Sequence, residues 1–94
     1  MIQITETEHF VQFCDLAVDS KSSRKLELLI NQFPCELKLI DYKIGYDGFT
    51  CIADENSTVN SLISGLEDVP SEIHCYYRVL FLKKKVENNG GMSV

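Results

Sequence analysis

Two segments of this sequence share one spacing of apolar residues, and that spacing constrains the fold more than any other feature. In each segment the apolar residues fall at i, i+3, i+4 and i+7, which places them on one face of an α-helix. The two sets are Leu26, Leu29, Ile30 and Phe33, and Val59, Leu62, Ile63 and Leu66. Alternating segments rich in apolar residues lie between and after them, so the sequence predicts a small α+β domain.

Capping and breaking residues mark the ends of both helices. The first helix is expected from about Ser23 to Phe33, because Pro34 cannot continue it. The second helix is expected to follow the polar stretch at residues 54–57, which supplies capping side chains, and to end near Leu66.

Three strands are expected around these helices. Residues 35–44 alternate, but their apolar face changes after Leu39, which predicts a β-bulge. Asp47 and Gly48 form the dipeptide most typical of a tight hairpin turn, so the next strand should return along the first. Residues 73–82 are apolar on both faces and should lie inside the sheet.

The segment from Glu8 to Asp19 fits two secondary structures. As a helix, it gathers its apolar residues on one stripe, and Thr5 with Glu8 would form a capping box. This interpretation is preferred, and it gives an antiparallel sheet of three to four strands with helices on one face, in the order (β)ααββαβ. As a strand, the same segment gives βαββαβ, the ferredoxin-like order.

The length and composition predict one domain. A chain of 94 residues has room for a single core, which we place at residues 1–85, followed by a disordered polar tail at residues 86–94. The first residues have no basic and apolar pattern of a secretion signal, and no apolar run approaches the ~20 residues that span a bilayer. A cytoplasmic protein without membrane contact is therefore expected.

The net charge of −5 limits the partners. An acidic domain repels phosphate backbones, so nucleic-acid binding is not expected, and a protein partner should have a basic surface. The Lys83-Lys84-Lys85 run is interpreted as a solvated strand end.

Residues that could carry chemistry are few. The four cysteines have no C-x-x-C spacing and are interpreted as small core thiols, so no metal, cofactor or disulfide is expected. His74 and Cys75 are adjacent, and on a strand they point to opposite faces, so they cannot form a nucleophile and base pair. The sequence therefore predicts no catalytic residues and no enzyme.

Tyrosines and acids supply the candidate binding site. Tyrosine contributes a large contact area at low entropy cost, and acids attract a basic partner. The predicted partner-binding residues are Tyr42, Tyr46, Asp47, Tyr76, Asp41, Asp54 and Glu55. The alternative is that the tyrosines pack at the rim of the core and the acids form turns and caps.

These observations favour a small acidic interaction module that inhibits or neutralises another protein by occluding it. Immunity proteins, antitoxins and phage anti-defence proteins share this general profile of size and charge. Two alternatives stay open: a ferredoxin-like domain that senses a small ligand at a dimer interface, and a self-associating structural subunit.

Overall fold

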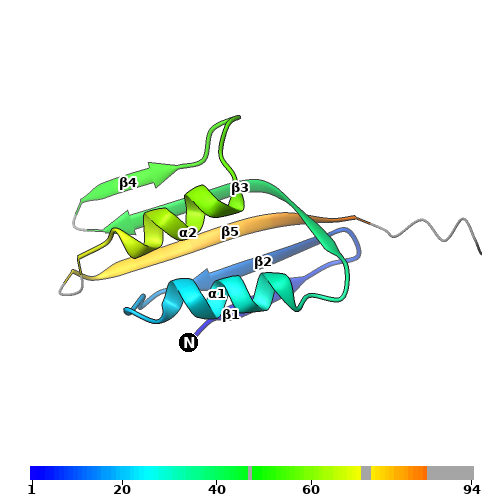
Figure 1. The fold of residues 1–94 in the computed structure, drawn as a ribbon, viewed down its shortest axis with the longest axis horizontal. Helices are drawn as coiled ribbons and strands as arrows, with labels where there is room; N and C mark the ends of the chain where they lie inside the picture. Colours follow the sequence, from blue (N-terminus) through cyan, green and yellow to red (C-terminus); the bar gives the residue numbers. More distant parts are fainter. Residues whose placement is uncertain (47, 71–72, 85–94) are drawn as a thin grey trace, which may run out of the picture.

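The computed structural model describes residues 1–46, 48–70 and 73–84, which form one sheet and two helices (Figure 1). In chain order the elements are β1 Gln3–Glu6, β2 Phe10–Asp15, α1 Ser22–Asn31, β3 Glu36–Tyr46, β4 Phe49–Ile52, α2 Val59–Glu67 and β5 Cys75–Lys84. The predicted tail and Asp47 lie outside the described residues. Within those residues, neither helix has the length and apolar character needed to cross a membrane.

The five strands form one antiparallel sheet in the order β1-β2-β5-β3-β4. As its two apolar faces predicted, β5 lies inside the sheet, between β2 and β3. Helix α1 connects β2 to β3, α2 connects β4 to β5, and each connection passes one intervening strand. Both helices lie on the same side of the sheet, so the domain has two layers (Figure 1).

The preferred helical interpretation of residues 8–19 is wrong, because Phe10–Asp15 forms strand β2. This strand pairs with β1 on one side and with β5 on the other. Its burial alternates accordingly, with Val11 and Phe13 fully buried. Aromatic and β-branched residues suit a strand once neighbouring strands are present. Pairing with β1 and β5 therefore outweighs the helical periodicity of this segment.

The chain before β2 also differs from the expectation. In place of a capping box of Thr5 and Glu8, a turn joins β1 to β2, and the Thr7 amide donates to the Phe10 carbonyl over 2.8 Å. No helical hairpin forms in the first third of the chain. The order is ββαββαβ, which is the predicted alternative βαββαβ preceded by one strand, and the sheet has five strands rather than three or four.

The remaining predicted elements are confirmed, with small differences at their ends. Helix α1 ends at Asn31, shortly before Pro34. The register between β3 and β5 shifts between Leu39 and Asp41, where the sequence predicted a bulge. Because of this extra residue, Leu39 before the bulge and Tyr42 after it both pack toward the core.

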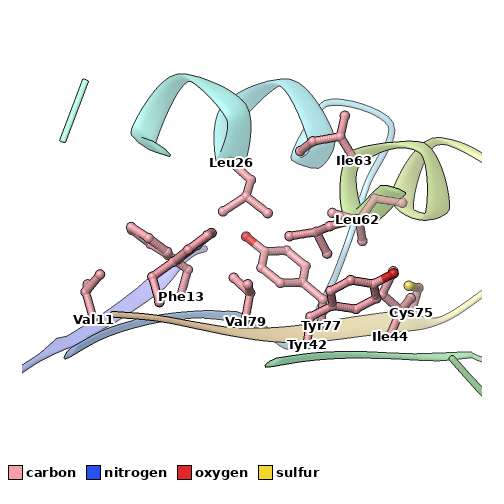
Figure 2. Packing of buried hydrophobic residues seen from close by; sticks show 12 residues of the cluster. Val11, Phe13, Leu26, Tyr42, Ile44, Leu62, Ile63, Cys75, Tyr77 and Val79 are labelled. Carbon is pink, nitrogen blue, oxygen red and sulfur yellow. The ribbon is translucent and has the colours of Figure 1, made fainter. Parts of the chain in front are cut away.

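The core lies between the helices and the sheet, and the described residues contribute twelve buried apolar side chains to it (Figure 2). Leu26 of α1 and Leu62 of α2 are fully buried. Gly65 allows α2 to approach the sheet closely, because a Cβ at that position would lie 3.0 Å from Cδ1 of Ile44. Both helical stripes therefore pack onto the same face of the sheet.

The cysteines are not all in the core, contrary to the prediction. Cys75 is buried, Cys14 and Cys35 are half-buried, and Cys51 is exposed on β4; all four are free thiols. Burial, with a smaller effect of Asp15, raises the pKa of the Cys75 thiol. Cys75 therefore behaves as a small apolar core residue, which is the role predicted for all four cysteines.

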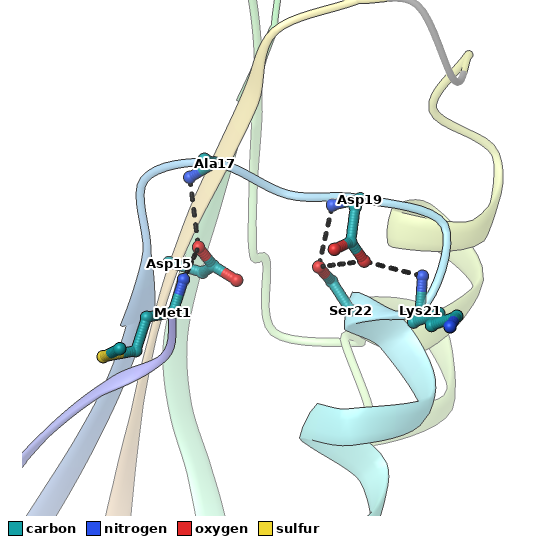
Figure 3. Close-up of polar contacts among 6 residues, drawn as sticks. All are labelled: Met1, Asp15, Ala17, Asp19, Lys21 and Ser22. Atoms are coloured by element: carbon teal, nitrogen blue, oxygen red, sulfur yellow. Dashed lines mark hydrogen bonds and ion pairs between the residues drawn. The ribbon is translucent and has the colours of Figure 1, made fainter.

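A hydrogen-bonded turn leads from β2 into α1 (Figure 3). The Lys21 amide donates to Asp19 Oδ1 over 2.8 Å, and the Asp19 amide donates to Ser22 Oγ over 2.8 Å. The hydrogen bond from Lys21 is the main reason that the pKa of Asp19 lies below its usual value. At the end of β2 the buried Asp15 accepts from the Ala17 amide over 3.0 Å. These contacts fix the point at which the helix begins.

Candidate interaction surface

The candidate surface is built at the turn of the β3–β4 hairpin. Tyr46 and Phe49 form the last residue pair of the hairpin, and their rings lie 6.0 Å apart at an angle of 37°. Gly48 has a φ of 80°, a conformation that glycine adopts without strain. The turn predicted from Asp47 and Gly48 is therefore confirmed by the residue pair that it connects, and it places two aromatic rings side by side.

Tyr76 lies against Gly45 on the neighbouring strand. The register pairs these two residues across β5 and β3, and any Cβ at position 45 would collide with the Tyr76 ring. Gly45 is therefore a site of close approach, where the missing side chain leaves room for an aromatic ring to rest on the backbone.

A hollow of about 200 Å³ lies at this end of the sheet. It is lined by Gly45, Tyr46, Gly48, Phe49, Thr50, His74 and Tyr76. It brings together two of the predicted tyrosines, Tyr46 and Tyr76. Aromatic faces of this kind accept aliphatic chains and the cationic heads of lysine or arginine.

Tyr42 lies elsewhere, in the core beneath α2, and is 6% exposed. Its hydroxyl lies 3.3 Å from Oγ of Ser61. Ser61 also forms the capping box of α2 with Thr58. In the free chain, Tyr42 therefore ties the first turn of α2 to the sheet. The sequence contained a sign that Tyr42 is buried, because the predicted bulge turns Tyr42 to the same side of the sheet as Leu39.

The predicted acids are dispersed over the molecule. Asp41 lies opposite Leu80, whereas Asp54 and Glu55 follow β4 at the end remote from the hairpin turn. Asp54 is held in its own turn, because its Oδ1 accepts from the Asn56 amide over 2.8 Å, in the same pattern as Asp19. Asp54 and Glu55 are exposed, and the structure does not gather them with the tyrosines.

The sequence analysis missed several side chains of this region, among them Phe49, His74 and Ile52. Phe49 and His74 line the hollow, and Ile52 lies on β4. Phe49 and Ile52 are 68% and 64% exposed, and β4 carries no charged residue. The available signal was the apolar strand directly after the turn, but its place at the edge of the sheet was not visible from the sequence.

No family model, curated protein or solved structure matches this chain. Among residues 1–46, 48–70 and 73–84, no three His, Cys, Asp or Glu side chains are grouped so that they could hold a metal ion. The geometry of the hairpin end is therefore the basis for the functional proposal.

Proposed function

We propose that this chain is a non-catalytic interaction module that inhibits or neutralises another protein by binding and occluding it. The binding surface runs along β4, from Phe49 beside the hairpin turn to Ile52 at the other end of the strand, with Tyr46 and Tyr76 close to Phe49. The observation that carries the proposal is the exposure of Phe49 and Ile52 on β4, an edge strand without charge. An unprotected apolar edge is a site where another chain docks.

The charge of the chain supports a basic partner. The net charge is −5, and Asp54 and Glu55 are exposed at the end of β4. A lysine or arginine of the partner would enter the aromatic hollow, where the ring faces attract a cation. Such a complex weakens as salt rises, because the opposite charges steer and hold the partners.

The test is affinity capture from the native host with three versions of the chain. Phe49→Ala removes the most exposed ring of the hairpin, and Leu28→Ala is the matched control, because Leu28 is 50% exposed on α1. The expected partner is retained by the wild type and by Leu28→Ala and is lost with Phe49→Ala. The same order of affinities must then be found by titration with the purified partner.

Two results would contradict the proposal. Equal affinity of the partner for Phe49→Ala and for the wild type would show that the hairpin is not part of the interface. An affinity that does not change with salt would remove the electrostatic part of the proposal and leave an apolar contact.

A second candidate is a small-ligand-sensing domain of ferredoxin-like type that acts as a dimer. The formation of β2 meets one requirement of this candidate, a strand at residues 10–15 within the chain order βαββαβ. Sedimentation at several concentrations, with a metabolite screen by thermal shift, tests it. A monomer that no ligand stabilises would exclude this candidate.

A further inference from the structure

The face of the sheet that points away from α1 and α2, called the open face below, carries a second set of surface groups. No helix of the described residues covers it, since both helices pack on the other face (Figure 2). Its side chains alternate with those of the core, so Arg78 lies on the open face between buried Tyr77 and Val79.

Two cations lie directly opposite each other at the centre of this face. The register pairs Lys43 of β3 with Arg78 of β5. Like charges in directly opposed positions of a sheet repel and destabilise it. Neither side chain forms an ion pair with a carboxylate of residues 1–46, 48–70 or 73–84. The pair therefore has unused capacity for an anion.

The open face is basic although the chain is acidic. Its charged residues on β3 and β5 are Glu36, Lys38, Asp41, Lys43, Arg78 and Lys84. Lys84 and Glu36 lie 3.7 Å apart and neutralise each other. The three other cations face one acid, so this face carries a net charge of +2 in a chain whose total is −5.

Asp41 offsets this charge only in part. It lies opposite Leu80, and it is therefore diagonal to Arg78, a separation of about 7–8 Å between backbones. It makes no ion pair with any described cation. Asp41 thus reduces the positive potential around Arg78 but does not occupy the Arg78 guanidinium.

Apolar side chains frame the cations. Leu80 and Tyr76 flank Arg78 along β5 and are half-buried, and Leu82 pairs with Phe10 on β2. Arginine and aromatic residues are enriched in protein interfaces, and exclusion of water by the surrounding apolar side chains strengthens a charge contact.

We propose that the open face binds an acidic segment of a protein, with Arg78 and Lys43 receiving its carboxylates. Arginine suits this task, because its planar guanidinium can hold both oxygens of a carboxylate. Two open faces would bring cations against cations, which disfavours a second copy of this chain. With three cations that are unpaired among the described residues, the face has too few positive charges for a nucleic acid, whose binding depends on many phosphate contacts. The open face adjoins the hairpin end at Tyr76 but differs from it in charge, so it adds a second contact to the proposed function.

The test is a titration of the isotope-labelled chain with a short oligoglutamate peptide, followed by amide chemical shifts at low salt. The largest shifts are expected in β3 and β5 around Lys43 and Arg78. The double variant K43Q/R78Q should weaken binding about tenfold, which is what two partly desolvated charge contacts contribute together. Asp41→Asn should tighten binding severalfold.

The matched control is R24Q/K25Q, which removes two cations from α1 and leaves the open face intact. An equal loss of affinity with this control would show attraction to any cation and would overturn the proposal. So would the absence of shifts in β3 and β5. Phe49→Ala should bind the peptide as tightly as the wild type. The peptide result then stands whether or not the hairpin surface binds a partner of its own.

Two further results would show that the open face binds something other than an acidic protein segment. Tighter binding of an oligouridylate than of the peptide, lost in K43Q/R78Q, would assign the face to a nucleic acid. A dimer in sedimentation that dissociates in K43Q/R78Q would assign it to a second copy. The variants change exposed or half-buried positions, and circular dichroism verifies that each is folded before titration.

Discussion

The two faces of the sheet are made by the same strands but hold different kinds of residue. Along β5, Tyr77, Val79 and Phe81 are fully buried against the helices, while Arg78 is exposed on the open face between the first two. The helix-covered face contains apolar side chains that keep the fold together. The open face combines cations with half-buried apolar residues. Neighbours in sequence are therefore expected to differ sharply in their effect on stability.

The largest effect is expected on the covered face, for Leu62→Ala. Leu62 is fully buried between α2 and the sheet, so its truncation should lower the free energy of unfolding by about 2–5 kcal/mol. Leu29→Ala on α1 should cost less, because Leu29 is only half-buried at the edge of the core. Urea denaturation of both variants measures the difference. Equal losses would mean that burial does not distinguish the two helices.

Gly45→Ala is an open-face change expected to behave like a core change. The new methyl group would collide with the Tyr76 ring, and overpacking of this kind costs about 1–3 kcal/mol. Tyr76→Ala in the same chain should recover most of the loss, because the colliding ring is gone. A double-mutant cycle in urea measures this coupling. Additive losses would show that the ring moves aside freely.

Tyr77→Phe is expected to stabilise the chain. The buried Tyr77 hydroxyl has no hydrogen-bond partner in the described residues, so its removal should raise the free energy of unfolding by about 1 kcal/mol. Thermal unfolding of the two chains at neutral pH measures the gain. A loss of stability would mean that a bound water satisfies the hydroxyl.

The same variant makes a prediction for alkaline pH. Burial, together with the charges of Asp15 and Cys14, raises the pKa of Tyr77 well above its usual value of 10.0. Above pH 10 the unfolded chain loses this proton while the folded chain keeps it, so the wild type should lose stability as the pH rises. Phenylalanine has no such proton. The advantage of Tyr77→Phe should therefore widen in alkaline solution.

The smallest effect on stability is expected for Arg78→Ala. Arg78 is exposed, so the free energy of unfolding should change by no more than about 0.5 kcal/mol. At low salt the variant should be slightly the more stable, because its repulsion with Lys43 is gone. Unfolding at low and high salt measures this difference. A large loss would place Arg78 among the residues that hold the fold.

Parts of the fold could be predicted because they depend on short segments. The stripe through Leu62, the bulge after Leu39 and the turn at Gly48 each arise from the spacing or backbone preference of adjacent residues.

Other parts could not be predicted from short segments. Residues 10–15 fit both the helical and the strand periodicity of apolar residues. The strand forms because β1 and β5 pair with it on its two sides. Tyr42 was included in the candidate site, but it packs in the core, because the bulge turns it toward α2. The exposure of Phe49 follows from the position of β4 at the edge, which depends on the order of the strands.

The sequence alone determined that this chain would form two amphipathic helices and a tight hairpin, since spacing and turn residues act over a few positions. The tertiary structure decided which strands pair, and through that pairing it set Arg78 opposite Lys43 and Tyr76 on Gly45. The physical reason is that strand pairing is an interaction between distant segments, and its free energy depends on all the competing partners together.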